Sequence, residues 1–415
     1  MQHRIVVLGA GYTGATAAGR LARRLHREDV TITLVTPEPD FVERVRLHQV
    51  AAGQDLAPRP FGEMFAGTGV ELKLARVTAV DVDRKAVTLA AADGPGPQGL
   101  EGPQGPQEAE ELEELEYDTL VYAFGSGWND GGVPGTAEHA DEISSRPGAL
   151  RLRGRLAALD AGRPVVVVGG GLTGLEAATE IAEARPDLDV ALAARGALGD
   201  WLSAKGRAHL RKVVDGLGIT VHEHTEVSAV AADGVTTADG RTLAAGITVW
   251  TTGFAVHPIA RATALELGDD GRIAVDTTMR SVSHPDVYAV GDAATATGPG
   301  GRPLRMSCAS GIPMAWQAAD AIAARLTGTK VPGASIRYFQ QCVSLGRKEG
   351  LIQFVTADDR AVDSALTGRV AAVYKELICK GAAWGVAHPT AGVPSRRRRV
   401  VRPQTRSRAQ AEATA

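Results

Sequence analysis

Two stretches of the chain share one hydrophobic pattern, in which an uninterrupted apolar run leads through glycines into a segment rich in small residues. The first is RIVVLGAGYTGATAAGRLA at residues 4–22, and the second is VVVVGGGLTGLEAATEIAE at residues 165–183. A continuous apolar run is typical of a strand buried on both faces of a parallel sheet. Each stretch is followed by a further apolar run, at residues 30–35 and 189–194. The pattern therefore predicts two βαβ units.

The turns of both units carry glycines at the spacing GxGxxG, which indicates a dinucleotide-binding loop. The first glycine allows a tight turn, the second lets the backbone approach a pyrophosphate, and the third brings helix and strand together. The start of the helix then offers amide donors and the positive end of its dipole to the phosphates. The predicted cofactor-binding residues are Gly9, Gly11 and Gly14 in the first unit, and Gly169, Gly171, Thr173 and Gly174 in the second.

Weaker patterns predict the remaining elements. Apolar runs bounded by turn residues predict strands within 70–92, 117–127, 219–231, 246–254 and 284–294, and longer runs predict helices at 204–217, 311–326 and 365–382. Residues 95–116, PGPQGLEGPQGPQEAEELEELE, are polar and repetitive and predict a disordered insertion. The basic tail at residues 396–415 is also expected to be disordered.

The composition narrows the function classes. A net charge of −3 gives no general attraction to nucleic acid, and 44% hydrophobic residues are ordinary for a globular protein. No apolar run approaches the roughly 20 residues that span a bilayer. The first residues lead straight into a strand without a signal segment. The three cysteines form no CxxC or zinc pattern, so we expect no metal site and a reduced, cytoplasmic setting.

Four segments occur in an order that resembles the two-dinucleotide flavoproteins of the pyridine nucleotide–disulfide oxidoreductase superfamily. They are GAGYTG at 9–14, TLVYAFGS at 119–126, GGGLTGLE at 169–176, and VWTTGF at 249–254 followed by VYAVGDAA at 287–294. The resemblance implies that the first unit binds FAD and the second binds NAD(P)H. It also implies that Gly125 and Gly253 mark the crossings between two domains, and that Asp292, after Gly291, hydrogen-bonds the FAD ribitol.

The fold class that follows is α/β, with two Rossmann-like three-layer domains, the second inserted in the first, and a small C-terminal α+β domain. The expected FAD-binding domain comprises residues 1–145 and 255–328, and the NAD(P)H-binding domain comprises 146–254. By the same resemblance, residues 329–395 cover the flavin and form dimer or membrane contacts.

The helix of the second unit favours one branch of this superfamily. No cysteine pair occurs in residues 41–53 or elsewhere, which speaks against disulfide reduction and gives sulfide oxidation poor support. The segment GGGLTGLEAATEIAE instead resembles the type II NADH dehydrogenases, in which a glutamate at the place of Glu176 lies near flavin and nicotinamide. Glu180 matches a second glutamate of that pattern, and the alternative is that both are helix-face carboxylates.

Other candidates rest on the same resemblance. Arg44, Arg46, His48 and Gln49 occupy a segment that passes beside the flavin, where His48 is either a proton relay to a quinone-like oxygen or a packing residue. The helix that begins near Gly311 and Ile312 is expected to point its N-terminus at the flavin. Cys308, just before it, is favoured as a buried structural cysteine over a low-pKa thiol. An AQxAxQ-like segment is missing there, with Gln317 retained, which leaves quinone as acceptor in doubt.

The ends of the two second strands bear on cofactor choice. A dinucleotide unit commonly places Asp or Glu there, where it accepts from the ribose 2′-hydroxyl. The position falls near Thr36 in the first unit and at Ala194, followed by Arg195, in the second. Arg195 suits a 2′-phosphate, which favours NADPH slightly over NADH. The alternative is that Arg195 is solvated and that the two are barely discriminated.

The sequence therefore predicts an FAD-dependent NAD(P)H dehydrogenase that passes hydride to FAD and then electrons to a quinone or quinone-like small molecule. One alternative is a reductase of a small electron-transfer protein, docked through Lys375, Lys380 and the arginine tail. Another is a slow-turnover redox sensor similar to apoptosis-inducing factor. A homodimer and a peripheral contact of the basic tail with the inner face of the membrane are further expectations.

Overall fold

The computed structural model describes residues 1–92, 112–331, 333, 335–391 and 397–401. Its first sheet has the order β18-β6-β1-β2-β3-β4-β5. These strands are β1 (His3–Leu8), β2 (Val30–Thr36), β3 (Val70–Asp81), β4 (Ala86–Ala91), β5 (Glu113–Glu116), β6 (Thr119–Tyr122) and β18 (Val287–Ala289). The first five in this order run parallel, with β1 in register with β2 from His3↔Val30 to Leu8↔Val35, whereas β4 and β5 pair antiparallel.

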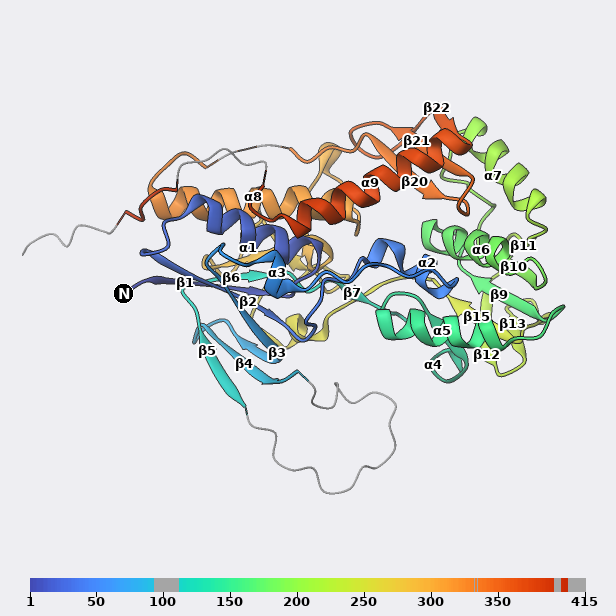
Figure 1. Ribbon diagram of the computed structural model, residues 1–415, viewed down its shortest axis with the longest axis horizontal. Coiled ribbons are helices and arrows are strands. Elements are labelled where there is room, and N and C mark those ends of the chain that lie inside the picture. Colours follow the sequence, from blue (N-terminus) through green and yellow to red (C-terminus); the bar gives the residue numbers. More distant parts are fainter. Residues whose placement is uncertain (93–111, 332, 334, 392–396, 402–415) are drawn as a thin grey trace, which may run out of the picture.

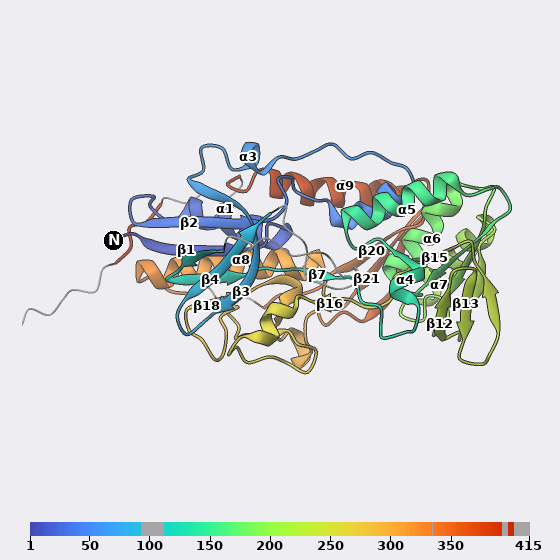
Figure 2. The ribbon, with the colours of Figure 1, turned by 90° about the horizontal axis from the view of Figure 1, so that it is seen from below.

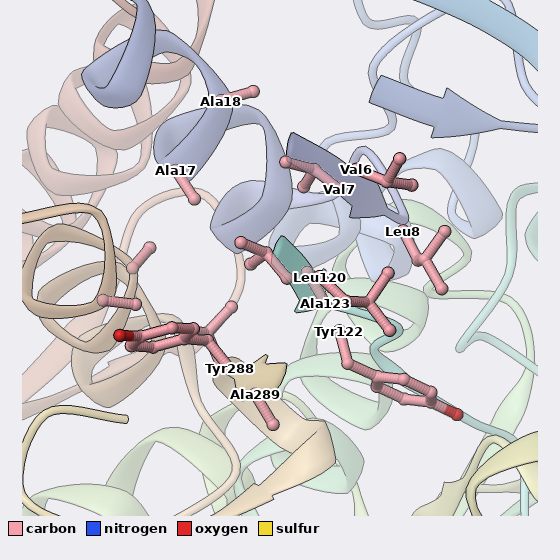
Figure 3. Close-up of a cluster of buried hydrophobic side chains, with 14 of the residues drawn as sticks. Val6, Val7, Leu8, Ala17, Ala18, Leu120, Tyr122, Ala123, Tyr288 and Ala289 are labelled. Carbon is pink, nitrogen blue, oxygen red and sulfur yellow. The ribbon is translucent and has the colours of Figure 1, made fainter. Parts of the chain in front are cut away.

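Two helices, α1 (Tyr12–Arg24) and α8 (Cys308–Thr327), lie side by side against this sheet (Figure 1). The core between helix and sheet combines branched strand residues with small helix residues, and Figure 3 shows Leu8, Leu120 and Tyr288 on the strands below Ala17 and Ala18 of α1. Each fully buried leucine of this kind contributes about 2 kcal/mol relative to an exposed one. The alanines let the helix approach closely, so the glycine turn at the end of β1 is held firmly.

The second sheet has the order β11-β10-β9-β15-β8, and all its pairs are parallel. Its strands are β8 (Ala140–Glu142), β9 (Pro164–Val168), β10 (Asp189–Ala193), β11 (Thr220–His222) and β15 (Ile247–Trp250). The helices of this region are α4 (Thr136–His139), α5 (Arg146–Ala158), α6 (Leu172–Ala184) and α7 (Ala204–Gly216), and β12 (Val227–Ala231), β13 (Gly234–Thr237) and β14 (Thr242–Ala244) form a separate antiparallel sheet. Both predicted βαβ units and the α/β class are therefore confirmed.

Two short strands carry the chain between the sheets. β7 (Ser126–Gly127) leaves the first sheet and β16 (Ala255–Val256) returns to it, and the two pair antiparallel with each other. The remaining short elements are η1 (Arg44–Arg46), α2 (Leu47–Ala51), α3 (Phe61–Met64), η2 (Pro258–Ala262), β17 (Ile273–Ala274), η3 (Gly291–Ala293), β19 (Ala294–Thr295) and η4 (Pro299–Gly301). The crossing strands bring the end of β6 next to the segment that follows β15.

The C-terminal unit consists of an antiparallel sheet and one long helix, seen from below in Figure 2. It comprises β20 (Gln340–Ser344), β21 (Gly350–Val355), β22 (Ala361–Thr367) and α9 (Arg369–Ala387). The α9 helix contacts α1, while β20 and β22 contact α6 and α7. Gln353 is fully buried, accepts from the backbone N–H of Ser203 at the start of α7, and donates to the carbonyl of Val362. The unit thus bridges both Rossmann-like sheets.

Two predictions of disorder are wrong in part. Residues 113–116 of the predicted insertion form β5, which pairs with β4 from Ala86↔Glu116 to Leu89↔Glu113. The backbone of Arg398 in the predicted tail bonds to Arg24 and His26 at the end of α1, because these terminal groups need partners. Residues 95–111, 396 and 402–415 of these two segments lie outside the described residues. Within the described part, no helix has the length and apolarity needed to cross a membrane.

Candidate active site

The first glycine turn is shaped to leave room in front of α1. Gly9 has a φ of 91°, which favours glycine, and a Cβ on Gly14 would lie 1.7 Å from the carbonyl oxygen of Gly9. A Cβ on Gly11, in contrast, would meet no atom within 4 Å among the described residues. Gly11 therefore faces open space at the helix N-terminus, where a pyrophosphate fits.

The second turn repeats this geometry at the start of α6. Gly169 has a φ of 128°, and a Cβ on Gly174 would lie 1.8 Å from the carbonyl oxygen of Gly169. Gly171 again faces open space within the described residues. Thr173 lies in the first turn of α6, partly exposed. Both turns thus fit a dinucleotide, and the motif spacing was sufficient to find them.

A third group of residues meets where η1, β7 and η3 come together, and it includes the predicted Arg44 and Asp292. The hydroxyl of Ser126 donates to Asp292 Oδ2 at 2.6 Å, and Arg44 donates to the carbonyl and hydroxyl oxygens of Ser126. Arg44 Nη1 lies 3.9 Å from Asp292 Oδ2. Burial lowers the pKa of Arg44, and the Asp292 carboxylate opposes that shift. Asp292 is therefore held by Ser126 and Arg44, a pairing that the spacing of the motifs did not indicate.

Close backbone packing joins this group to the first glycine turn. A Cβ on Gly291, whose φ is 71°, would lie 2.9 Å from Cγ2 of Thr13, and one on Gly311 would lie 2.8 Å from the same atom. Gly125 sits beside Arg44, with 3.3 Å between its ideal Cβ and Nη1. Ile312 follows at the start of the second turn of α8 and is partly exposed. The N-terminal parts of α1 and α8 therefore lie close together.

Glu176 lies at the centre of a buried polar cluster formed by four elements. Its Oε1 is 3.0 Å from Lys375 Nζ of α9 and accepts the backbone N–H of Ser344 in β20, also at 3.0 Å. Its Oε2 is 3.9 Å from His48 Nδ1 of α2. Lys375 also donates to the carbonyl of Cys342 at 3.1 Å. Glu176 is therefore not a solvated helix-face carboxylate.

The charges in this cluster follow from burial and pairing. Burial alone raises the pKa of Glu176, but Lys375, His48 and the Ser344 N–H together lower it. Burial lowers the pKa of Lys375, and the attraction of Glu176 reverses this and raises it above its ordinary value. Burial lowers the pKa of His48 to about 4 against the pull of Glu176. At neutral pH the cluster holds one carboxylate, one ammonium and one neutral imidazole.

Lys375 was misassigned from the sequence as part of an exposed docking face. Lys375 instead lies on the buried face of α9, where its side chain is 15% exposed and contacts Glu176. A signal did exist, because the fully buried Ala371 and Ala383 and the buried Cys379 share its face at steps of four residues. A lone lysine on such a face normally extends to water, and its partner on α6 could not be found from local pattern.

Two other residues of the segment expected to pass beside the flavin, Arg46 and Gln49, form a hydrogen bond with each other. Arg46 Nε donates to Gln49 Oε1 at 2.8 Å, and Arg46 Nη2 lies 3.0 Å from Glu376 Oε1 on α9. Gln49 is 3% exposed. Gln49 therefore orients Arg46, which in turn ties α2 to α9. Sequence position alone brought these two side chains into the same candidate set as His48.

The three cysteines are free thiols. Burial raises the pKa of Cys308, and it raises the pKa of Cys342 and of Cys379 to about 11. The helix dipole at the start of α8 does not overcome this effect for Cys308. Cys308 and Cys342 are partly exposed and Cys379 is buried, and none of the three thiols is activated for attack on a disulfide.

The nucleotide-discriminating positions lie at the ends of β2 and β10. Thr36 is buried, and its hydroxyl accepts from the backbone N–H of Glu38 at 3.2 Å. A Cβ on Gly170 would lie 2.8 Å from the Cβ of Ala194, so Arg195 follows directly beside the second glycine turn. Arg195 is exposed and makes no hydrogen bond or ion pair with the rest of the described chain. Gly253 has a φ of 70° and lies beside Asn129.

The glycine turns, the Asp292 group and the Glu176 cluster define a two-dinucleotide oxidoreductase. The pattern of the pyridine nucleotide-disulphide oxidoreductase family matches residues 3–323, and the chain belongs to this family. Within the described residues, no group of His, Cys, Asp or Glu side chains is arranged to hold a metal ion.

The comparisons also show which members it resembles. It is 30% identical to an NADH dehydrogenase-like protein of Mycobacterium tuberculosis, over 75% of this chain and 78% of that protein. It is 28% identical to a type II NADH:quinone oxidoreductase of the same species, over 70% and 66% of the two chains. NDH2 of Plasmodium falciparum in complex with NADH has the same fold, with a TM-score of 0.76, 13% identity, and coverage of 94% and 97%. An engineered water-forming NADPH oxidase aligns with a TM-score of 0.66 and 17% identity, covering 85% and 75%.

We predict that Lys375→Met destabilises the protein by about 3–5 kcal/mol, because it leaves the Glu176 carboxylate buried without a cation. The double variant Lys375→Met/Glu176→Gln removes both charges and is expected to lose less than Lys375→Met alone. Equilibrium unfolding in urea measures both effects.

Lys380→Met is the matched control on the next turn of α9. Its ammonium is 63% exposed and pairs with Glu376 at 3.4 Å, so its loss is expected to cost less than about 1 kcal/mol. Equal losses for the Lys375 and Lys380 variants would show that the Glu176 pair is not buried in solution.

Proposed function

We propose that this protein is an FAD-dependent NAD(P)H dehydrogenase that passes two electrons to a quinone or a quinone-like small molecule. The observation that carries the proposal is the buried Glu176–Lys375 pair with the neutral His48 beside it. The pair joins the helix of the second glycine turn to the C-terminal unit. The type II NADH:quinone oxidoreductase among its relatives supports the same acceptor class.

Separate groups of residues would bind FAD and the nicotinamide nucleotide. FAD would be held by the turn of Gly9 to Gly14, by Asp292 with Arg44, and by the first turn of α8. The nicotinamide nucleotide would be held by the turn of Gly169 to Gly174. FAD, when bound, accepts hydride from the nicotinamide and returns the electrons to an acceptor. The N-terminal end of α8 favours negative charge nearby.

The described geometry speaks against disulfide reduction and against docking of an electron-transfer protein through Lys375. Disulfide reduction requires a reactive cysteine pair, and burial raises the pKa of each thiol in this chain. Docking of an electron-transfer protein through Lys375 is unsupported, since Lys375 is buried against Glu176. A slow redox sensor would hold the same cofactors and differ in turnover.

We predict that the purified protein is yellow, that anaerobic NADH or NADPH bleaches the flavin rapidly, and that menadione restores the colour faster than ferredoxin or oxygen does. Stopped-flow absorbance at the flavin band measures both half-reactions. Slow bleaching with a long-lived charge-transfer band would favour the sensor, and faster reoxidation by ferredoxin would favour the protein reductase. A protein that neither carries nor takes up flavin contradicts the whole proposal.

We further propose that NADPH is preferred over NADH. Arg195 is exposed beside the second glycine turn, and the preceding Ala194 removes the carboxylate that would repel a 2′-phosphate. The engineered NADPH oxidase carries adjacent substitutions of aspartate to alanine and alanine to arginine, which makes the same Ala-Arg pair.

Arg195→Glu is expected to reverse the ratio of kcat/KM for NADPH and NADH, with a change of about tenfold or more, because a carboxylate repels the 2′-phosphate and accepts from a 2′-hydroxyl. Lys205→Glu, at an exposed position in α7 of the same region, is the control for net charge. An unchanged ratio in Arg195→Glu would mean that Arg195 does not contact the phosphate.

We also propose that α9, rather than the basic tail, contacts the membrane surface. Val370, Leu377 and Trp384 repeat every seven residues and are 66%, 63% and 56% exposed, so they form one apolar stripe. The exposed Arg369 and Lys380 lie on the same helix and suit anionic headgroups. A quinone acceptor dissolved in the bilayer would be reached from this side.

Leu377→Glu is expected to weaken sedimentation with vesicles of phosphatidylglycerol and phosphatidylcholine by about tenfold, since it places a carboxylate in the apolar stripe. Val282→Glu, at a 52% exposed position outside α9, should leave vesicle binding unchanged. If vesicles fail to bind the wild type and Leu377→Glu instead splits a dimer in gel filtration, the stripe is a homodimer contact.

A further inference from the structure

A second buried carboxylate lies on α6, one turn beyond Glu176. Glu180 is 2% exposed, and its Oε1 accepts from the side-chain amide of Gln54, which follows α2. The backbone N–H of Gln54 in turn bonds to the carbonyl of Gln49 at the end of α2. Since His48 faces Glu176 and Gln54 faces Glu180, α2 runs along α6 from one carboxylate to the other.

Two polar atoms in the seam between α6 and the segment of α2 and Gln54 have no hydrogen-bond partner among the described residues. Glu180 Oε2 and His48 Nε2 are both buried, and neither has a hydrogen-bond partner among the described residues. Buried polar atoms of this kind are normally bonded to ordered water. His48 Nδ1 already faces Glu176, so its ring can receive a proton at one nitrogen and release one at the other. Gln54 is partly exposed and marks the solvent end of the seam.

The charges around Glu180 place it between its two protonation states near neutral pH. Burial raises its pKa to about 7, with Glu176 and Glu183 of α6 adding to the shift. Arg347 in the turn between β20 and β21, and the amide of Gln54, oppose it. His48 on α2 is neutral at this pH. A carboxyl group so balanced can both bind and release a proton in the working range.

We propose that Glu180 takes up protons from solvent and passes them, through water and His48, to the Glu176–Lys375 pair at the reaction site. The inference rests on the proposed function. Reduction of a quinone by NAD(P)H follows NAD(P)H + H⁺ + Q → NAD(P)⁺ + QH₂. The nicotinamide supplies both electrons and one hydrogen nucleus as hydride, and the second proton comes from solvent. Glu180 is a proton-carrying residue that acts through His48 and touches neither cofactor nor acceptor.

Glu180→Gln tests the proposal with two acceptors. Menadione needs the solvent proton, whereas ferricyanide takes electrons alone. We expect Glu180→Gln to lower the rate of menadione reduction about tenfold and to abolish its inflection near pH 7, with ferricyanide reduction and flavin bleaching unchanged. Glu180→Asp should restore part of the menadione rate. Glu183→Gln, which removes a neighbouring charge from the next turn of α6, should keep the inflection but move it to lower pH, because Glu183 helps to raise the pKa of Glu180.

Thermal unfolding of the purified holoprotein gives a readout independent of turnover. A glutamate whose folded pKa is raised from 4.5 to about 7 stabilises the fold most at low pH, and the stabilisation is lost as pH rises through that window. The melting temperature of the wild type is therefore expected to fall from about pH 5 to about pH 8, and Glu180→Gln should flatten this slope.

The outcomes separate the two levels of inference. A wild type that reduces no quinone ends the proposed function, while a melting slope removed by Glu180→Gln would still establish that Glu180 titrates near neutrality. A wild type that reduces menadione, with the same pH profile in Glu180→Gln, overturns the relay. Equal slowing of menadione and ferricyanide overturns it as well, because a purely structural defect affects both acceptors.

Discussion

A charge taken into a protein interior has to be paired, and the contact of Glu176 with Lys375 at 3.0 Å meets that constraint between two distant parts of the chain. The carboxylate belongs to the helix of the second glycine turn, and the ammonium belongs to α9. Neither side chain can leave the other without a large cost in free energy. The pair therefore fixes how the C-terminal unit lies against the nucleotide-binding helix.

Other buried polar contacts extend the same junction. Gln353 caps the start of α7 from within β21, and Arg46 ties α2 to Glu376 on α9. The α9 helix also packs on α1, so the C-terminal unit touches the helices of both glycine turns and the segment expected to pass beside the flavin. The C-terminal unit thus supplies Lys375 and the Ser344 N–H, which lower the pKa of Glu176. The family pattern itself matches residues 3–323, which end before this unit begins.

The structure also separates carboxylates that look alike in sequence. Glu176 and Glu180 are one turn apart on α6, and both are buried. Glu176 has a cation and a backbone N–H, which lower its pKa. Glu180 has one amide donor and an oxygen with no partner among the described residues, and burial raises its pKa to about 7. The two glutamates therefore differ because of their surroundings: Glu176 stays ionised, whereas Glu180 titrates near neutral pH.

The sequence by itself determined the two strand–turn–helix units, because glycine spacing and apolar runs act within about 30 residues. The spacing of the turn glycines was enough to predict the roles of Gly9, Gly14, Gly169 and Gly174 in these turns. Only the tertiary structure decided the place of Lys375, the pairing of residues 113–116 with β4, and the attachment of Arg398 to the end of α1. In each of these cases the partner comes from a remote segment. Hydrogen bonds and charges between remote segments leave no periodicity in the local sequence from which they could be predicted.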